Sequence, residues 1–201
     1  MKYLLITLYA LTLFSSSAQS SQSIVLSEED RDAITRVALA EASNQGEGGL
    51  SGVVWVILNR YKNGNFGNSI TEILNAKNQF EPVTKVKTWK ALPTPTKSQL
   101  EKINTIINLA LSGYFSDPTK GALYFQNPDI VKQREVAGTV SKGLTHFGGS
   151  TPTITINDHA FYAENNVIES STVHEEKPPA KSWDVFNNST YKINQNSLKA
   201  W

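Results

Sequence analysis

The stretch ITRVALAEASNQGEGGLSGVVWVILNR, residues 34–60, decides the fold, and a glutamate lies near its centre. Ile34, Val37 and Ala38 are spaced at i, i+3 and i+4, which is the spacing of the apolar face of an α-helix. The next position on that face, i+7, is Glu41, and a polar, glycine-rich run follows it at once. The pattern therefore predicts a helix that carries a carboxyl group on its buried face, in its last turn.

Two physical effects favour the protonated form of Glu41. Burial raises the pKa of a carboxyl group because the ionised form loses its hydration. The negative end of the helix dipole acts in the same direction. A carboxyl group that is protonated near neutral pH can serve as a general acid. The alternative is a structural glutamate paired with a cation such as Arg36, Arg60 or Lys62, and the helix pattern alone favours that alternative.

The sequence around this stretch predicts further helices. Ser27, with acidic residues in the next three positions, predicts the N-cap of the first helix, which should end near Ala42. Residues 43–49 contain three glycines and are predicted to form a loop. Residues 50–61 have apolar residues on one helical face and predict a buried helix. Residues 79–92 are predicted to be an irregular loop.

Two more helix starts are visible in the first half of the chain. Ser69 is predicted to cap a short helix. Thr96 and Gln99 form the pattern of a capping box, in which each side chain bonds the other residue's backbone N–H. The helix after Thr96 has the clearest apolar stripe in the sequence, and Gly113 is predicted to end it.

After Gly113 the apolar pattern changes to that of strands. Residues 121–127, 153–157 and 160–163 have strand composition. Residues 129–149 are polar and contain glycines, so they are predicted to be mostly loop. The expected fold class is α+β, with N-terminal helices followed by a small antiparallel β-sheet.

Residues 1–20 have the pattern of a secretory signal peptide. Lys2 supplies the positive charge, residues 3–14 form the apolar segment, and residues 16–18 are the small residues of a cleavage site. The apolar segment is too short for a permanent membrane anchor. We therefore expect an exported protein, located in the periplasm, in the cell envelope or outside the cell.

The composition excludes several classes of function. The chain has 201 residues and no cysteine, so it has neither a disulfide framework nor a thiol nucleophile. Without Lys2 it has 18 basic and 18 acidic residues, and this balance argues against a nucleic-acid binder. Residues 165–201 are polar and are expected to be a flexible tail.

Other catalytic chemistries find little support in the sequence. His146, His159 and His174 form neither an i, i+4 pair nor an HExxH motif, so we expect no metal and no other cofactor. Ser51 lies in GGLSG, which is not the GxSxG motif of a serine hydrolase; it is expected near a helix start. A glycosidase with two carboxylates is left open, with three candidates for the second carboxylate: Glu47, Glu72 and Glu81.

Four segments carry a family resemblance, and they occur in the expected order. They are LAEASNQGEGGLSGVVWVILNRY, NQFEPV, DPTKGALYFQNP and ITINDHAFYAE. Together they resemble the SleB-type cell wall hydrolases, the family of the spore cortex-lytic catalytic domains, over residues 33–163. The resemblance implies a lysozyme-like fold and makes residues 27–164 the expected catalytic domain.

The resemblance also implies an activity. The family's catalytic glutamate corresponds to Glu41, and the implied substrate and partner is peptidoglycan. The implied reaction is lytic transglycosylation, which cleaves the bond between N-acetylmuramic acid and N-acetylglucosamine and leaves a 1,6-anhydro end. One glutamate acts first as acid and then as base, so this reaction needs no second carboxylate.

The matched segments contain six further candidate site residues. Gln79 is expected to donate a hydrogen bond to an N-acetyl group. Tyr124 and Tyr162 are expected to stack on sugar rings, although Tyr124 could equally face the core. Supporting roles, such as tying the second helix to neighbouring loops, are expected for three residues: Asn59, Arg60 and His159.

One departure from the family leaves alternatives open. Many relatives have a second glutamate four residues after the first, where this chain has Gln45, with Glu47 two residues further on. One alternative is an N-acetylmuramoyl-L-alanine amidase, which requires zinc. The other is a non-catalytic peptidoglycan-binding module, and Gln45 favours keeping it under consideration.

Overall fold

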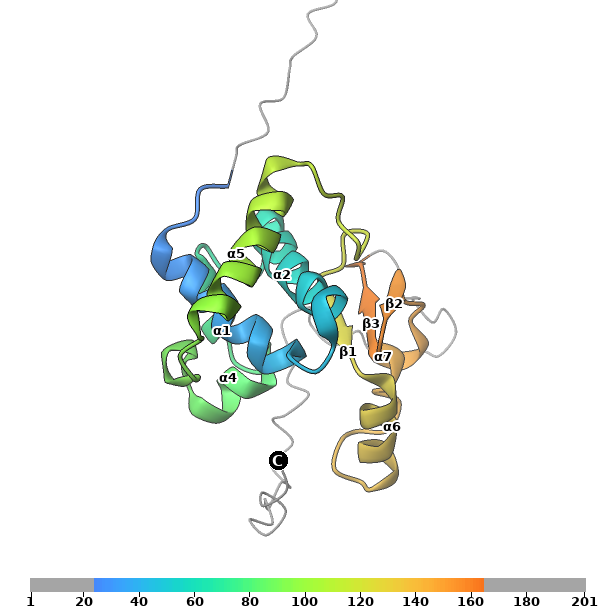
Figure 1. Cartoon of the computed structure of the whole chain (residues 1–201). Helices are drawn as coiled ribbons and strands as arrows, with labels where there is room; N and C mark the ends of the chain where they lie inside the picture. Colours follow the sequence, from blue (N-terminus) through green and yellow to red (C-terminus); the bar gives the residue numbers. More distant parts are fainter. Residues whose placement is uncertain (1–23, 165–201) are drawn as a thin grey trace, which may run out of the picture.

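The computed structural model describes residues 24–164 and consists of a helical part and a small sheet (Figure 1). The predicted signal peptide and the predicted C-terminal tail lie outside the described residues. Five helices, α1 to α5, form the helical part. Three strands with helices α6 and α7 lie beside it and form what we call the sheet part. This arrangement is the α+β order expected from the sequence.

The helical part holds most of the hydrophobic core. It contains α1 (Glu28–Ala42), α2 (Gly46–Asn63), α3 (Ile70–Asn75), α4 (Glu81–Val86), the 3-10 helix η1 (Trp89–Ala91) and α5 (Lys97–Ser112). Helix α2 runs through the middle, and all of its residues from Gly49 to Leu58 are buried. The expected buried helix is therefore confirmed. Because a helix that is apolar on all sides must be covered on all sides, α2 organises the packing of the other helices.

The predicted caps of α1 and α5 are confirmed. Ser27 and Asp30 form a capping box at the start of α1, and Thr96 and Gln99 form one at the start of α5. Gly113 follows α5 in the left-handed conformation, with φ of 73°. Ser69 caps α3 through its side chain, as expected.

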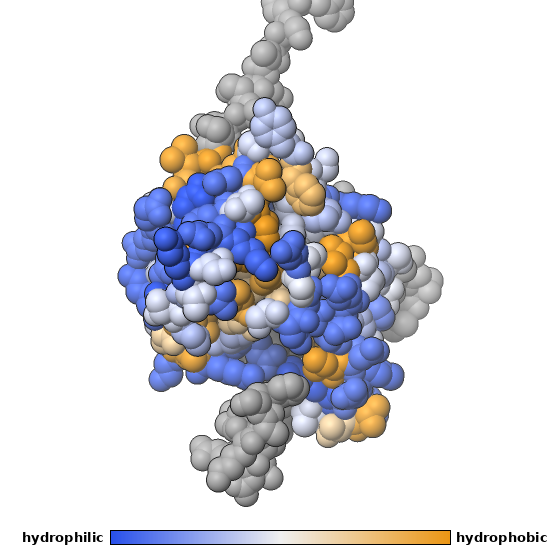
Figure 2. Space-filling model, viewed as in Figure 1, coloured by the Kyte–Doolittle hydropathy of each residue, from blue (hydrophilic) through white to orange (hydrophobic). Residues whose placement is uncertain are grey.

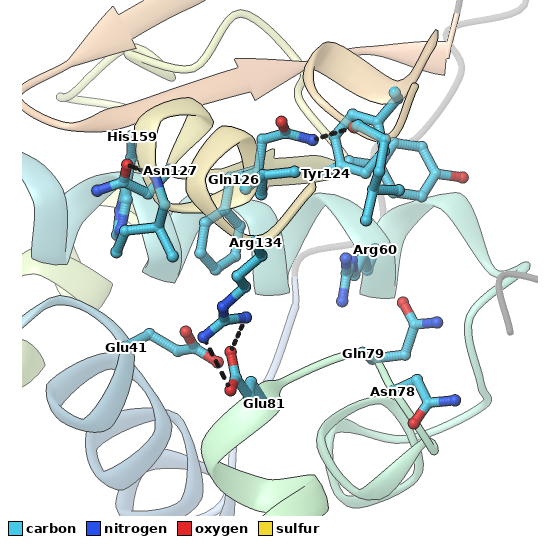
Figure 3. Close-up of a pocket in the computed structure, with 15 residues that line it drawn as sticks. Glu41, Arg60, Asn78, Gln79, Glu81, Tyr124, Gln126, Asn127, Arg134 and His159 are labelled. Carbon is cyan, nitrogen blue, oxygen red and sulfur yellow. Dashed lines mark hydrogen bonds and ion pairs between the residues drawn. The ribbon is translucent and has the colours of Figure 1, made fainter. Parts of the chain in front are cut away.

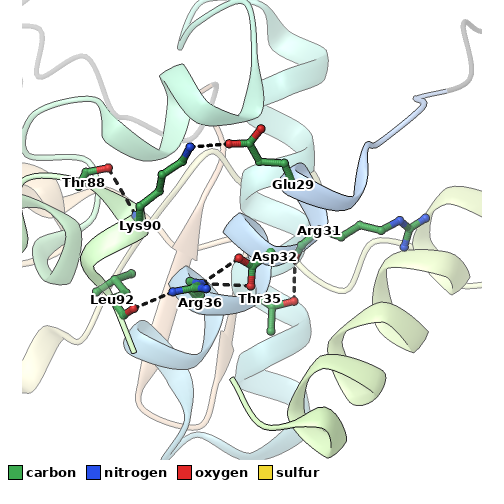
Figure 4. A network of polar contacts seen from close by, with 8 residues as sticks. All are labelled: Glu29, Arg31, Asp32, Thr35, Arg36, Thr88, Lys90 and Leu92. Atoms are coloured by element: carbon green, nitrogen blue, oxygen red, sulfur yellow. Dashed lines mark hydrogen bonds and ion pairs between the residues drawn. The ribbon is translucent and has the colours of Figure 1, made fainter. Parts of the chain in front are cut away.

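Polar contacts connect α1 to the segment that contains η1 (Figure 4). Arg36 Nε bonds Asp32 within α1, and Arg36 Nη1 donates to the carbonyl of Leu92 at 3.0 Å. Lys90 pairs with Glu29 at 2.8 Å. The contacts fix the segment after α4 against α1, the helix that carries Glu41.

The prediction of a loop over residues 43–49 is wrong, because α2 already begins at Gly46. Gly49, and Gly52 further along, allow close packing of the helix and do not end it. A Cβ at Gly49 would lie 2.2 Å from Gln45 Cβ, and a Cβ at Gly52 would lie 2.4 Å from Phe161 Cζ. Such distances are far below van der Waals contact, so only glycine allows this approach of the chain.

The sheet has three short antiparallel strands. They are β1 (Tyr124–Gln126), β2 (Ile154–Ile156) and β3 (His159–Tyr162), in the order β1-β3-β2. Phe125 faces Phe161 in the register of β1 and β3. Strand β3 is buried along its whole length and packs against α2 through Phe161. The three predicted strands are therefore confirmed; the first two are shorter than predicted, and the third begins and ends one residue earlier.

Two predicted loops contain helices. Residues 79–92 include α4 and η1, and residues 129–149 include most of α6 (Pro128–Val136) together with α7 (His146–Gly149). Helix α4 has six residues and buries only Val83, while every residue of α6 is at least partly exposed. Helices with so little buried surface have no apolar stripe, which is why the periodicity of the sequence did not reveal them.

Within residues 24–164, the helices are all too short or too polar to cross a lipid bilayer. The surface seen in Figure 2 is mostly hydrophilic, with hydrophobic residues in small, separate groups.

Candidate active site

A pocket of about 280 Å³ lies between the helical part and the sheet part. Figure 3 shows Glu41 and Glu81 on the helical side and Arg134 reaching toward them from α6. The pocket wall comes from α1, α2, α4 and the segment before it on the helical side, and from β1, β3, α6, α7 and the loop before α7 on the other side. Its lining residues are Glu41, Arg60, Asn78, Gln79, Glu81, Tyr124, Phe125, Gln126, Asn127, Ile130, Val131, Arg134, Leu144, Phe147 and His159.

Glu41 is the next-to-last residue of α1 and is partly buried in the pocket wall. Burial raises the pKa of its carboxyl group from 4.5 to about 8, and the charge of Glu81 adds to this increase. Arg60, a hydrogen bond with the backbone of Glu81 and the charge of Lys85 act in the opposite direction on this pKa. The side chain is therefore protonated at neutral pH, which is the state that a general acid needs.

Glu81 opens α4 and remains ionised beside Glu41. Burial opposes its ionisation, but hydrogen bonds with Arg134 and Lys85 hold its pKa below the usual range. Arg134 Nη1 donates to Oε2 at 3.1 Å, and Arg134 Nη2 donates to Oε1 at 3.2 Å. Lys85 Nζ lies 3.0 Å from the same Oε1. The two carboxyl groups thus have different protonation states because their surroundings differ.

Arg60 is a buried cation in the pocket wall, with 3% of its surface exposed. Its Nε donates to the carbonyl of Leu123 at 2.7 Å, which connects α2 to the residue just before β1. Its guanidinium lies 5.0 Å from the ring centre of Phe66, 5.0 Å from that of Phe80 and 5.9 Å from that of Tyr124. Burial lowers the pKa of Arg60 to about 10, so it keeps its charge at neutral pH. Among the described residues, its Nη1 has no hydrogen-bond partner.

Asn59 connects α2 to the loop before β1. Its Nδ2 donates to Asp117 Oδ2 at 2.8 Å and to the carbonyl of Ala122 at 3.1 Å. Asn59 itself lies outside the pocket lining. Its contacts fix the start of the strand that carries Tyr124.

Two of the three expected substrate-binding residues line the pocket. Gln79 and Tyr124 both face it, and Figure 3 shows Arg60 between them. Tyr162 does not line it, because its side chain is fully buried. Burial raises the pKa of Tyr162 to about 12, and its hydroxyl lies 2.7 Å from His146 Nδ1. Tyr162 therefore lies behind the pocket wall and not at the sugar-facing position expected from the sequence.

His159 lines the pocket from β3 and packs against two aromatic rings. Its ring centre lies 5.2 Å from that of Phe125 and 6.2 Å from that of Phe161. Burial lowers its pKa, with Asp158 acting in the opposite direction, so the ring is neutral at pH 7. Its Nδ1 is buried and has no hydrogen-bond partner within residues 24–164.

Only one candidate for a second carboxylate, Glu81, lines the pocket. The exposed side chain of Glu47 pairs with Lys102 at 3.3 Å, and Glu72 accepts a hydrogen bond from the backbone of Asn68 at 2.8 Å. Gln45 is buried, and its side chain bonds both the carboxylate and the backbone N–H of Asp158. Gln45 thus holds the turn between β2 and β3 against the start of α2.

Ser51 lies inside α2 and is buried, five residues after the helix begins. In the part of the chain that the structure describes, no group of three or more His, Asp or Glu side chains is placed to hold a metal ion. His174, the third histidine, lies outside that part.

Four charged or polar residues of the pocket were not predicted from the sequence: Asn78, Gln126, Asn127 and Arg134. Helix α6 positions the last two, and a signal for that helix was present. Asn127 caps α6 by accepting a hydrogen bond from the backbone of Ile130 at 3.1 Å, and Pro128 occupies the first helical position. An asparagine N-cap followed by proline is a common helix start, and it marks α6 even without an apolar stripe.

Comparison of the sequence with protein families identifies the class of protein that this fold and pocket define. Residues 44–162 match the cell wall hydrolase family. The match covers more than half of the chain, so the protein belongs to the cell wall hydrolase family. The matched range begins after Glu41 and includes every other residue of the pocket. No curated protein matched the sequence.

Two solved structures resemble the fold. One is the catalytic domain of the germination-specific lytic transglycosylase SleB from Bacillus anthracis, with 22% identity and a TM-score of 0.50, covering 68% of this chain and 95% of that chain. The other is the catalytic domain of the Bacillus cereus SleB protein, with 22% identity and a TM-score of 0.50, covering 68% and 91%. The expected lysozyme-like fold of a SleB-type cell wall hydrolase is therefore confirmed.

Proposed function

We propose that this protein is an exported lytic transglycosylase that cleaves peptidoglycan between N-acetylmuramic acid and N-acetylglucosamine, with Glu41 as the catalytic acid and base. The observation that carries the proposal is the environment of Glu41. Burial and the charge of Glu81 keep its carboxyl group protonated near neutral pH, in the wall of a pocket. Family membership supports the class of substrate, and the similar solved structures support the fold.

In the first step, Glu41 donates its proton to the oxygen that bridges the two sugars, and the bond from that oxygen to the muramic acid C1 breaks. In the second step, the 6-hydroxyl of the same muramic acid attacks C1, and its proton passes to the Glu41 carboxylate. No water is consumed, the product is a 1,6-anhydro sugar, and Glu41 ends in its starting state. Arg60 supports the first step because its buried positive charge stabilises the carboxylate that forms.

The state of Glu81 supports this reaction over one with two carboxylates. A nucleophile or base needs a carboxylate oxygen that can reach the substrate or a water molecule. Both oxygens of Glu81 accept hydrogen bonds from Arg134, and one is also paired with Lys85. We therefore assign Glu81 no role as a nucleophile.

For the remaining residues, we propose two groups of roles. Gln79 donates a hydrogen bond to an N-acetyl group, and Tyr124 offers its ring to a sugar. Asn59 and His159 support the pocket wall that carries Tyr124, and Tyr162 supports the same wall through its contact with His146.

The test is mass spectrometry of the soluble fragments that the protein releases from purified peptidoglycan. We expect fragments that are lighter by one water than the reducing muropeptides. The Glu41→Gln variant should lower their release at least about 100-fold, since general acid catalysis commonly contributes this much. Glu47→Gln is the matched control, because Glu47 is exposed and lies outside the pocket.

Other results would support other functions. Reducing fragments that disappear in Glu41→Gln would indicate a hydrolytic muramidase. Release of stem peptides that stops after treatment with a chelator would indicate a zinc amidase. Binding to peptidoglycan without any release, equal in wild type and variant, would indicate a binding module.

A further inference from the structure

The Glu81–Arg134 ion pair connects the two walls of the pocket. Glu81 is the first residue of α4 in the helical part, and Arg134 lies in the last turn of α6 in the sheet part. The pair is bidentate, with N–O distances of 3.1 Å and 3.2 Å. In Figure 3 its charged groups lie next to the carboxyl group of Glu41.

Stability does not explain this pair well. The two side chains are 37% and 36% exposed, and ion pairs with such exposure contribute little to folding. Helix α6 itself packs loosely, with Ile130 at 45% and Val136 at 81% exposure. A bidentate contact fixes the relative position of its two side chains. At the end of such a helix, its main effect is therefore on the geometry of the pocket.

We propose that Glu81 and Arg134 are positioning residues that act on Glu41 through their charges: the Glu81 carboxylate beside the acid favours its protonated form, and Arg134, paired with Glu81, partly offsets that effect. This inference rests on the proposed function, in which Glu41 is the acid. It adds that the sheet part controls the proton affinity of a residue in the helical part. The charged and titratable groups that act on the pKa of Glu41 or line the pocket with it are Arg60 from α2, Glu81 and Lys85 from α4, Tyr124 from β1, Arg134 from α6 and His159 from β3.

The proposal predicts shifts of opposite sign. An ionised Glu81 disfavours a second negative charge on Glu41, so Glu81→Gln should lower the pKa of Glu41. The same variant leaves Arg134 without its carboxylate, which lowers the pKa of Glu41 further. Arg134→Gln instead removes the cation that compensates Glu81, so it should raise the pKa of Glu41. A structural role in folding alone would not produce two shifts of opposite sign.

The experiment is a carbon-13 NMR titration of the Glu41 carboxyl group in the full chain, with the resonance assigned by its loss in Glu41→Gln. We expect a decrease of roughly one pH unit in Glu81→Gln and an increase of roughly half a unit in Arg134→Gln. Arg134→Lys keeps the charge and should shift the pKa less than Arg134→Gln. The alkaline limb of the pH profile of kcat/KM should move in the same direction as each titration.

Glu47→Gln is the matched control. Glu47 also pairs with a cation on another helix, Lys102 on α5, but lies outside the pocket. It should leave the titration of Glu41 unchanged, and thermal unfolding should show that all variants are folded. The inference is overturned if Glu81→Gln and Arg134→Gln both leave the pKa unchanged, or shift it in the same direction. The titration does not depend on activity, so it stays informative even if Glu41→Gln remains fully active and the proposed function fails.

Discussion

The helical part and helix α6 differ in how they are held, although both form the pocket. In the helical part, α1, α2, α3 and α5 bury their apolar faces against one another. Every residue of α6 is at least partly exposed, and the ion pair of Arg134 with Glu81 connects it to the helical part. Packing therefore fixes the position of Glu41, whereas polar contacts fix the position of Arg134.

This difference indicates a division of tasks. A buried carboxyl group with a raised pKa costs stability, and a well-packed core can offset that cost. A weakly packed helix on the opposite wall can move without disturbing the core, since local opening needs less free energy where few apolar contacts are lost. The pocket thus combines a rigid acid with a more adjustable wall.

The largest expected effect is on stability, when the same Ile→Ala substitution is made in the helical part and in α6. Ile57 is fully buried in α2, whereas Ile130 on α6 is 45% exposed. We expect Ile57→Ala to lower the free energy of unfolding by about 2–5 kcal/mol, because it leaves a cavity. Ile130→Ala should change it by less than about 0.5 kcal/mol. Urea denaturation measures both, and equal losses would contradict the comparison.

The same contrast explains which elements were predictable from the sequence. Helices α1, α2 and α5 bury apolar faces, and their patterns predicted them. Helices α4 and α6 bury little, so their residues carried no periodic signal, although they hold Glu81 and Arg134. The contact between two polar residues that are 53 positions apart depends on the tertiary structure alone.

Within the site, the sequence predicted the burial of Glu41 but not the full cause of its raised pKa. The apolar stripe placed the carboxyl group correctly on the inner face of α1. The second cause, the charge of Glu81, needed the fold. Tyr162 shows the opposite limit: an aromatic residue in a strand was expected to face the sugar, and the register of β3 buries it.

The second prediction concerns the cost of the buried acid. The folded-state pKa of Glu41, about 8, lies above the ordinary value of 4.5. Between these pH values, Glu41 keeps its proton in the folded protein and releases it in the unfolded chain, and this release favours unfolding. The free energy of unfolding therefore has its full value below pH 4.5 and decreases as the pH rises to 8. Glutamine cannot ionise and should not show this loss.

Urea denaturation of wild type and Glu41→Gln at pH 5 and pH 8.5 measures this contribution. The stability of the variant relative to wild type should increase by about 4 kcal/mol between the two pH values. Other titrating groups are shared by both proteins and cancel in the difference. A difference that is the same at both pH values would mean that Glu41 ionises normally.

The third prediction tests the contact between the two parts, where α2 meets β3. A Cβ at Gly52 would lie 2.4 Å from Cζ of the fully buried Phe161. Gly52→Ala should therefore destabilise the protein by about 1–3 kcal/mol. Gly48→Ala is the control on the same helix, since its nearest neighbour, the Cγ2 methyl of the partly exposed Ile156 at 3.1 Å, needs to move by only a few tenths of an ångström. The control gains helix propensity and should be close to neutral. Thermal unfolding distinguishes the two, and a neutral Gly52→Ala would show that β3 can move away from α2.

The smallest expected effect concerns the hold of Arg134 on α6. If the ion pair with Glu81 restrains α6, then Arg134→Gln should increase hydrogen exchange of the α6 amides about two- to fivefold, which corresponds to about 0.5–1 kcal/mol of opening free energy. Exchange in α2 should stay unchanged, because its amides open with the packed core. Glu101→Gln, which breaks an exposed pair with Lys97 on α5, is the control and should leave α6 unaffected. Equal exchange of α6 in wild type and Arg134→Gln would mean that other contacts hold this helix, and that the adjustable wall of the pocket is as fixed as the wall that carries Glu41.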